Sequence, residues 1–198
     1  MSSPVAAHTA IRRFVPPPPP KTPKSAGTRV RLLEVATPLF IERGYAAVSM
    51  RDIASAAKLT KGAVYGHFRS KGQLFVEVIR WKIAERDHAP GFSEATADFE
   101  LGIGLMYAED RRDIRLLEVD AAAAARHDPD VAAGLASLYG ERDARIRDAM
   151  ADVRDPDTAA WLVGVLSAGI GTKESTGLPL PDADRLHATL VAVLRALE

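Results

Sequence analysis

The stretch of sequence that decides the fold is Ser49–Lys71, which reads Ser-Met-Arg-Asp-Ile-Ala-Ser-Ala-Ala-Lys-Leu-Thr-Lys-Gly-Ala-Val-Tyr-Gly-His-Phe-Arg-Ser-Lys. Ser49 is a good N-cap, so we expect a short helix over residues 50–57. Residues 58–59 form a tight turn, and a second short helix is expected over residues 60–67. Two short helices joined by a tight turn are a helix–turn–helix. The sequence therefore predicts this motif in the first half of the chain.

Apolar residues at helical spacing divide the motif into an inner and an outer side. The inner side is expected to hold Ile53, Ala54 and Ala57 in the first helix and Val64 and Phe68 in the second, with Leu59 in the turn. The remaining residues, on the outer side or at the helix ends, are the ones that we predict to contact DNA: Ser49, Thr60, Lys61, Gly62, Ala63, Tyr65, His67 and Lys71.

The outer residues have the chemistry that a DNA duplex requires. A helix N-terminus presents free N–H groups and the positive end of a dipole, and Lys61 in this first turn reaches the major groove. Gly62 and Ala63 are small enough for the backbone to approach the bases. Tyr65 and His67 offer a hydroxyl and a ring N–H to phosphate oxygens. The chemistry of these outer residues thus predicts a DNA-binding surface.

Each of these residues also has a purely structural interpretation. Ser49 is a helix cap, Tyr65 suits a core aromatic with an exposed hydroxyl, and His67 favours a helix C-terminus through its partial charge. Lys61 and Lys71 are of a type that is usually solvated. It is their joint spacing that favours DNA binding.

Outside the motif the sequence predicts helices only, so the expected fold class is all-α. A helix over residues 26–43 contains Pro38, which removes one backbone hydrogen bond, and ends at Gly44. Ser70 caps a longer helix over residues 71–87. Further helices are expected over residues 93–108, 112–126, 129–153, 156–172 and 182–198.

Charge is unevenly distributed, although the formal net charge is zero. Residues 25–86 carry 11 lysines and arginines against 5 acidic residues, and residues 87–198 carry 11 against 21. A basic front and an acidic back indicate that the front meets a polyanion. Residues 1–24 carry four basic residues, no acidic ones and seven of the thirteen prolines, which predicts a disordered or polyproline arm. This arm is either an inert leader or a source of extra phosphate contacts.

Composition excludes several classes of protein. The chain of 198 residues has no cysteine, so disulfides and cysteine-ligated zinc are ruled out, and its five histidines lack ligand spacing. There is no Gly-rich phosphate loop and no Gly-x-Ser-x-Gly elbow, so we predict no catalytic residues, no metal and no cofactor. The longest apolar run, residues 159–170, is shorter than the about 20 residues that span a bilayer. Without a signal-peptide core, the chain is expected in the cytoplasm.

The motif also resembles a known family. Gly44-Tyr-Ala-Ala-Val-Ser-Met-Arg-Asp-Ile-Ala, followed by Leu59-Thr-Lys-Gly-Ala-Val-Tyr-Gly-His-Phe-Arg-Ser-Lys71, resembles the DNA-binding domain of TetR-family transcriptional repressors, over roughly residues 26–80. The resemblance implies an all-helical homodimer whose first three helices bind a palindromic operator in double-stranded DNA. Its C-terminal part would bind a small molecule that releases the operator.

The same resemblance assigns roles within the motif. Lys61, Gly62 and Ala63 would lie over bases, and the phosphate contacts would come from Thr60, Tyr65, His67 and Lys71. The chain departs from the family pattern at Pro38, inside the first helix. It also departs at Gly66, where the family commonly has a bulkier residue.

The C-terminal sequence favours a subunit interface. Residues 159–170 are apolar or small on every side, and the last helix has leucines at near-heptad spacing. An intramolecular core is the alternative. We expect three parts: an arm (1–24), a helix–turn–helix domain (25–72) and a domain for effector binding and dimerisation (73–198). The predicted interface residues are Trp161, Val165, Gly169, Leu186, Leu190 and Leu194.

The resemblance to TetR-family repressors implies an effector pocket among the helices between residues 80 and 175. Glu118 and Asp120 are two residues apart, so they point to different faces of one helix. Few aromatic residues follow Tyr107, which favours an apolar or amphipathic ligand. The predicted pocket residues are Trp81, Met106, Tyr107, Leu116, Glu118, Tyr139 and Trp161.

These observations lead to one expected function and one alternative. The chain is expected to be a sequence-specific DNA-binding regulator, a repressor released by a small ligand. The alternative is a regulator that binds DNA constitutively, without an effector.

Overall fold

Every regular element in the described part of the chain is a helix. The computed structural model describes residues 14–87, 108–151 and 154–195. In chain order the elements are α1 (Pro23–Ala47), α2 (Met50–Ala56), α3 (Lys61–Tyr65), α4 (Lys71–Asp87), the short 3-10 helix η1 (Glu109–Arg111), α7 (Arg112–Ala125), α8 (Pro129–Ala149), α9 (Pro156–Ser175) and α10 (Ala183–Arg195). No helix among them is long and apolar enough to span a bilayer.

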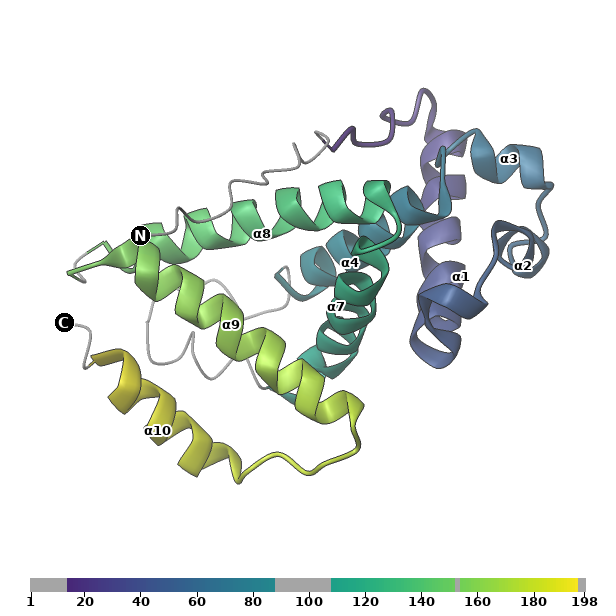
Figure 1. Cartoon of the computed structure of the whole chain (residues 1–198). Coiled ribbons are helices and arrows are strands. Elements are labelled where there is room, and N and C mark those ends of the chain that lie inside the picture. Colours follow the sequence, from purple (N-terminus) through teal and green to yellow (C-terminus); the bar gives the residue numbers. More distant parts are fainter. Residues whose placement is uncertain (1–13, 88–107, 152–153, 196–198) are drawn as a thin grey trace, which may run out of the picture.

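The helices form two connected groups. In Figure 1, α1, α2 and α3 lie at one end of the molecule, and α4 leads from them towards α7, α8 and α9. The last helix, α10, lies at the other end, beyond α9. The all-α prediction, with a helix–turn–helix unit followed by a helical C-terminal part, is thereby confirmed.

The helices begin at the caps that the sequence predicts. Ser49 Oγ accepts a hydrogen bond from the Asp52 N–H at 3.2 Å, and Asp52 Oδ2 accepts one from the Ser49 N–H at 2.9 Å. These two bonds complete a capping box. The Ser49 hydroxyl also donates to Asp52 Oδ2 at 2.6 Å, and this bond, followed by the bond from the Ser49 N–H, holds the pKa of Asp52 below its usual value. Asp128 caps α8, and Asp155 caps α9 by accepting from the Thr158 N–H at 3.1 Å.

Helix α1 starts earlier than predicted and breaks at Gly44, as predicted, before a short last segment up to Ala47. It begins at Pro23, capped by Thr22, three residues before the expected start. It continues through Pro38, which lies on the exposed side. At Gly44 the backbone leaves the helical region, with φ +75° and ψ 163°, a conformation that glycine adopts readily.

Two other predicted elements differ or cannot be compared. Helix α8 ends at Ala149 rather than at residue 153. The helix expected over residues 93–108 falls almost entirely outside the described residues.

The described end of the proline-rich segment, residues 14–22, contains neither helix nor strand and contacts the body. The Val15 carbonyl accepts a hydrogen bond from Gln73 Nε2 at 2.9 Å, and Pro17 is buried. The guanidinium of Arg80 lies 5.7 Å from the Phe14 ring centroid. These contacts attach this part of the arm to α4.

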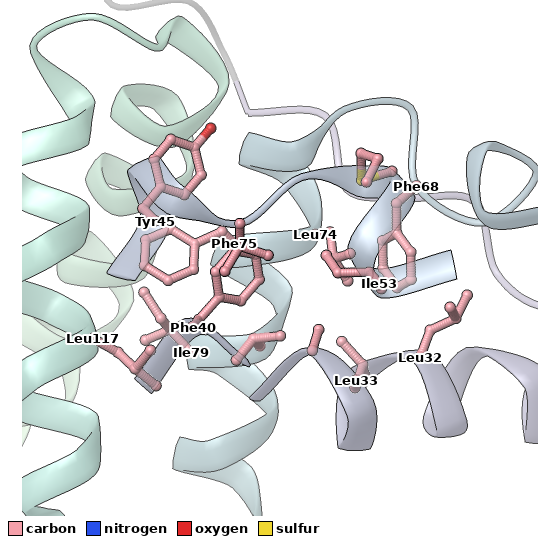
Figure 2. Close-up of a cluster of buried hydrophobic side chains, with 14 of the residues drawn as sticks. Leu32, Leu33, Phe40, Tyr45, Ile53, Phe68, Leu74, Phe75, Ile79 and Leu117 are labelled. Carbon is pink, nitrogen blue, oxygen red and sulfur yellow. The ribbon is translucent and has the colours of Figure 1, made fainter. Parts of the chain in front are cut away.

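One hydrophobic core joins the two groups of helices. It combines residues of α1, α2, α4, α7 and α8 with Phe68 from the segment after α3. Figure 2 shows Phe40 of α1, Phe75 of α4 and Leu117 of α7 close together in this cluster. The Phe40 and Phe75 ring centroids are 4.6 Å apart. Because α1 and α4 share these side chains with α7, the first three helices are not an independently packed unit.

In the C-terminal part, small residues let the helices approach closely. A Cβ at Gly134 of α8 would lie 2.5 Å from Val76 of α4, and one at Gly171 of α9 would lie 3.1 Å from the Arg115 carbonyl of α7. A smaller cluster, which includes Leu190 of α10 and Val163 of α9, packs α10 onto the rest.

Candidate DNA-binding interface

The geometry of the α2–turn–α3 motif follows from its caps and one unusual residue. Lys58 has φ 53° and is the one non-glycine residue with positive φ in the described ranges, which gives the turn its sharp reversal. The turn is closed by a 2.9 Å hydrogen bond from the Leu59 N–H to the Ala54 carbonyl. Thr60 then caps α3 by accepting from the Ala63 N–H at 3.1 Å. The side chain of Thr60 is therefore engaged at the helix start.

The inner side of the motif is the one that the apolar spacing predicts. Ile53, Ala57, Val64 and Phe68 are fully buried, Ala54 is nearly so, and Leu59 is partly buried in the turn. Since these side chains hold α2 and α3 against α1 and α4, the opposite side of α3 is directed away from the core.

The outer side carries the residues predicted to contact DNA, and their exposure differs. Ser49, Thr60, Lys61, Gly62 and Tyr65 are exposed, with 44% of Tyr65 accessible to solvent. The other three, Ala63, His67 and Lys71, are partly buried. The fold thus brings all eight around α3 and the ends of its two neighbours, and their contact with DNA stays a prediction.

Lys61 and Tyr65 lie one helical turn apart and contact each other. The Lys61 ammonium is 5.7 Å from the Tyr65 ring centroid, within the range of a cation–π interaction. Beside them, a Cβ at Gly62 would meet only the Thr60 hydroxyl, at 3.9 Å, so the backbone here is open to a large partner. At Gly66 a Cβ would lie 3.3 Å from the Ala63 carbonyl oxygen, so glycine permits the compact end of α3.

Lys71 has an internal partner that its sequence position does not suggest. Its Nζ donates a 2.8 Å hydrogen bond to the Tyr45 carbonyl and lies 4.0 Å from the Tyr45 ring centroid. Burial lowers the pKa of Lys71, and the carboxylates of Asp128 and Asp120 partly oppose this effect. An ammonium has three N–H donors, so the bond to Tyr45 leaves others for a phosphate.

Arg29 supports the end of the motif, and the sequence analysis missed it. Its guanidinium lies 4.9 Å from the Phe68 ring centroid, and its Nη2 is 2.7 Å from Glu77 Oε2 on α4. Burial first, and the charge of Arg29 second, lower the pKa of His67. Both effects favour the neutral imidazole, which presents a single ring N–H. No periodicity in the sequence indicates the Arg29–Glu77 pair, which is 48 residues apart.

The predicted pocket residues are only partly gathered in the C-terminal part. Met106 and Tyr107 lie outside the described residues. Trp81 and Tyr139 pack at the edge of the main core, and Leu116 is partly buried on α7. Trp161 is 62% exposed, so within one chain it does not line an interior wall.

Glu118 stands out among these residues because it is a buried carboxylate. Burial raises its pKa, and the guanidinium groups of Arg111, Arg142 and Arg115 oppose this rise less strongly. Burial raises the pKa of the Tyr139 phenol, and the nearby charge of Glu118 adds to this rise. Arg142 lies 4.5 Å from the Tyr139 ring centroid. Buried polar groups of α7 and α8 thus lie beside the hydrophobic core, a feature that the apolar character of the neighbouring segments hid.

Only some of the predicted interface residues are exposed on the surface of the chain. Trp161, Val165 and Gly169 form an exposed row on α9, whereas Leu186 is partly buried and Leu190 is buried within the chain. The side chain of Leu194 lies outside the described residues. The apolar row on α9 is unusual for an exposed surface, and its role as an interface stays a prediction.

Comparisons with known proteins agree with the motif. Residues 32–78 match the family model described as bacterial regulatory proteins, tetR family. Over 67 residues the chain is 45% identical to the HTH-type transcriptional repressor KstR2 of Rhodococcus jostii, covering 34% of this chain and 33% of that protein. Over 58 residues it is 43% identical to the HTH-type transcriptional regulator AcrR of Shigella flexneri, covering 29% and 26%. The matched part thus spans about a third or less of these relatives.

The whole fold also has a solved counterpart. A putative TetR-family transcriptional regulator from Rhodococcus sp. superposes with a TM-score of 0.71 at 16% identity, over 87% of this chain and 98% of that one. At this level of identity the likeness establishes the fold alone. The sequence matches therefore concern the N-terminal helices, and the structural match extends to the C-terminal helices.

Proposed function

We propose that this chain, whose residues 32–78 match the tetR family of bacterial regulatory proteins, is a DNA-binding transcriptional regulator of that family and not an enzyme. It acts as a repressor that binds a palindromic operator as a homodimer and leaves it when a small ligand binds its C-terminal domain. In this proposal residues 25–72 bind DNA, and residues 73–198 bind the effector and form the dimer.

The observation that carries the proposal is the open outer side of α3. Lys61 and Gly62 are exposed at the start of a helix whose other side is buried, and Tyr65 follows one turn later. A helix presented in this way fits the major groove, with its N-terminal residues at the base edges. Exposed Thr60 and Ser49 flank it with hydroxyls suited to phosphate oxygens.

A homodimer is supported by the exposed apolar row on α9. Trp161 and Val165 are 62% and 46% exposed, one helical turn apart, and Gly169 follows at the next turn. A two-fold symmetric pair of such helices buries the row and presents two copies of α3. Recognition helices about 34–36 Å apart, or a multiple of that spacing, match successive half-sites of a palindrome.

The polar group around Glu118 supports a ligand with an amphipathic character. Glu118 and Tyr139 offer an acceptor and a hydroxyl that lie close enough to interact electrostatically, and Trp81 packs against the same hydrophobic core as Tyr139. A carboxylate that is taken out of water is costly unless it is hydrogen-bonded, so a ligand that donates to it gains affinity.

Selection of genomic DNA fragments by the purified protein tests DNA binding directly. We expect recovery of fragments that share a palindrome, and a steep loss of affinity with increasing salt. No preference for any fragment at low ionic strength would contradict the proposal. Compounds suggested by the genes next to the selected fragments then test release. A compound that binds tightly and leaves operator affinity unchanged would favour the constitutive regulator instead.

A further inference from the structure

The end of α1 meets both α7 and α8 at a single residue, Tyr45. After the break at Gly44, the Tyr45 side chain turns back into the core and is only 8% exposed. Its ring centroid lies 4.9 Å from that of Phe75 on α4. Figure 2 shows Tyr45 at the edge of the hydrophobic cluster, with its hydroxyl pointing away from Phe40 and Phe75.

Two carboxylates from the C-terminal domain hold Tyr45. Asp120 of α7 accepts a hydrogen bond from the Tyr45 backbone N–H, and Asp128 accepts one from the Tyr45 hydroxyl through Oδ2. The other oxygen of Asp128 caps α8, at 2.9 Å from the Asp130 N–H. One side chain therefore both starts α8 and binds the end of α1. Burial and the charge of Asp128 raise the pKa of Tyr45, so the phenol stays protonated and continues to donate.

The start of α4 also contacts this group of Tyr45, Asp120 and Asp128, which we call the junction. Lys71 donates to the Tyr45 carbonyl at 2.8 Å, as described above. A Cβ at Gly72 would lie 2.7 Å from Asp128 Oδ1, so α4 approaches the α8 cap more closely than any larger residue allows. Ser70 Oγ donates to Asp130 Oδ2 at 2.6 Å. The α1, α4, α7 and α8 helices thus converge on one hydrogen-bonded group.

Tyr45 connects the part of the chain proposed to bind DNA with the part proposed to bind the ligand. It belongs to α1, which packs against the α2–α3 motif through the shared core. On the other side, Asp120 lies two residues from Glu118, so α7 presents one carboxylate to the C-terminal interior and another to α1. A shift of α7 that accompanies ligand binding therefore moves the acceptor of the Tyr45 N–H.

We propose that Tyr45 is a positioning residue that fixes the orientation of the helix–turn–helix on the C-terminal domain through Asp120 and Asp128. This inference rests on the proposed function. Opening the contact leaves the Tyr45 hydroxyl without its acceptor and Asp128 Oδ2 without its donor, so the junction favours discrete closed and open arrangements over intermediate ones. The closed arrangement holds α3 in the position that binds operator.

Because the chain contains no cysteine, spin labels can be attached at two introduced cysteines. The distance between the labels reports how the helix–turn–helix lies relative to the C-terminal domain. Ala56→Cys on α2 and Ala136→Cys on α8 change two exposed alanines. The double variant is spin-labelled and diluted with excess unlabelled wild type, so that the label-to-label distance within one chain is recorded by pulsed dipolar spectroscopy. In the parent we expect one narrow distance distribution.

Two substitutions separate the contact from the helix cap. Tyr45→Phe removes only the hydroxyl. Asp128→Ser keeps a good N-cap for α8 but is too short to reach Tyr45, whereas Asp128→Asn keeps the cap through its amide oxygen and can donate from its amide nitrogen to the Tyr45 oxygen. We expect Tyr45→Phe and Asp128→Ser to broaden or shift the distribution and to weaken binding to a selected genomic fragment by about tenfold. Asp128→Asn should resemble wild type, and the Tyr45→Phe/Asp128→Ser double variant should be no worse than either single variant.

Thr37→Val is the matched control. It also removes a buried hydroxyl of α1, but one whose 2.8 Å hydrogen bond goes to Leu33 within the same helix. A general loss of stability would affect this variant in the same way as Tyr45→Phe.

The outcomes distinguish the inference from the proposed function. Unchanged distances in both Tyr45→Phe and Asp128→Ser overturn the inference, as do changed distances with unchanged DNA affinity. If the wild type binds no fragment, the proposed function fails, and the distances alone decide whether Tyr45 holds the two domains together.

Discussion

Arg115 of α7 and Glu174 of α9 form a two-pronged ion pair in the interior of the C-terminal domain. Their Nε–Oε2 and Nη2–Oε1 distances are both 2.6 Å, and the side chains are 0% and 7% exposed. Arg115 Nη1 also donates to the Ala108 carbonyl at 2.9 Å. The pair ties the two helices together beside Gly171, where a Cβ would lie 3.1 Å from the Arg115 carbonyl oxygen.

Removing one member of this pair should destabilise the protein strongly. Arg115→Met leaves the Glu174 carboxylate buried and unpaired, which costs about 3–5 kcal/mol of unfolding free energy. Replacing both residues by methionine should recover much of this loss, because no buried charge remains. Urea denaturation measures both variants, and a double variant as unstable as Arg115→Met would contradict the expectation.

Lys61 and Tyr65 should contribute to operator binding and little to folding, since both are exposed. We expect Lys61→Ala and Tyr65→Phe each to weaken binding to a selected fragment, with a loss of about 1–3 kcal/mol for Lys61→Ala if it contacts a base. Lys173→Ala, an exposed lysine at the end of α9, is the control and should bind normally. A parallel fall in melting temperature would show that the two side chains are structural.

Lys71 should contribute to both folding and phosphate binding. We expect Lys71→Met to lower the unfolding free energy by about 1.5–3 kcal/mol, because it removes a charge-assisted hydrogen bond to Tyr45. It should also weaken binding to all sequences alike and reduce the slope of log affinity against log salt by about one unit. Titrations at several salt concentrations measure the slope, and an unchanged slope would restrict Lys71 to its internal contact.

The exposed row on α9 should hold two subunits together. Trp161→Lys and Val165→Lys place a charge where the apolar surface would be buried, so we expect monomers that remain folded. Val30→Lys, at a 43% exposed valine of α1, is the matched control and should leave the oligomeric state unchanged. Light scattering and circular dichroism give the mass and the helicity, and dimers of the α9 variants at micromolar concentration would refute the predicted interface.

Glu118 should make stability depend on pH. Its pKa in the folded protein lies above its unfolded value because burial disfavours the carboxylate. Wild-type stability from this group is therefore fully present below about pH 4.5 and is lost as the pH rises through the folded pKa. Glu118→Gln cannot ionise, so its unfolding free energy relative to wild type should increase as the pH rises from about 4.5 through the folded pKa of Glu118. If the difference in unfolding free energy between the two proteins stays constant as the pH rises, burial does not disfavour the ionised form of Glu118.

Much of the fold could be predicted from local sequence signals. The starts of α2, α8 and α9 follow from Ser49, Asp128 and Asp155, because a cap satisfies backbone groups within its own helix turn. The buried set around Ile53 and Val64 follows from apolar spacing. The end of α8 and the start of α1 were misjudged, because the last turn of a helix depends on contacts as well as on propensity.

The candidate DNA-binding surface was accessible to the same reasoning, since all its residues lie within one short stretch. The network around Glu118, the Arg115–Glu174 pair and the junction at Tyr45 were not. Their members are separated by up to 83 residues, and no local pattern pairs a tyrosine hydroxyl with the cap of a distant helix.

By itself, then, the sequence determined the helices, the motif and the outer side of α3, because hydrogen bonding and apolar periodicity act over a few residues. Only the tertiary structure decided that Tyr45 binds α7 and α8, that Lys71 donates inward and that the C-terminal interior contains charged groups. Those relationships depend on how helices pack against one another, and packing brings together residues that the chain keeps far apart.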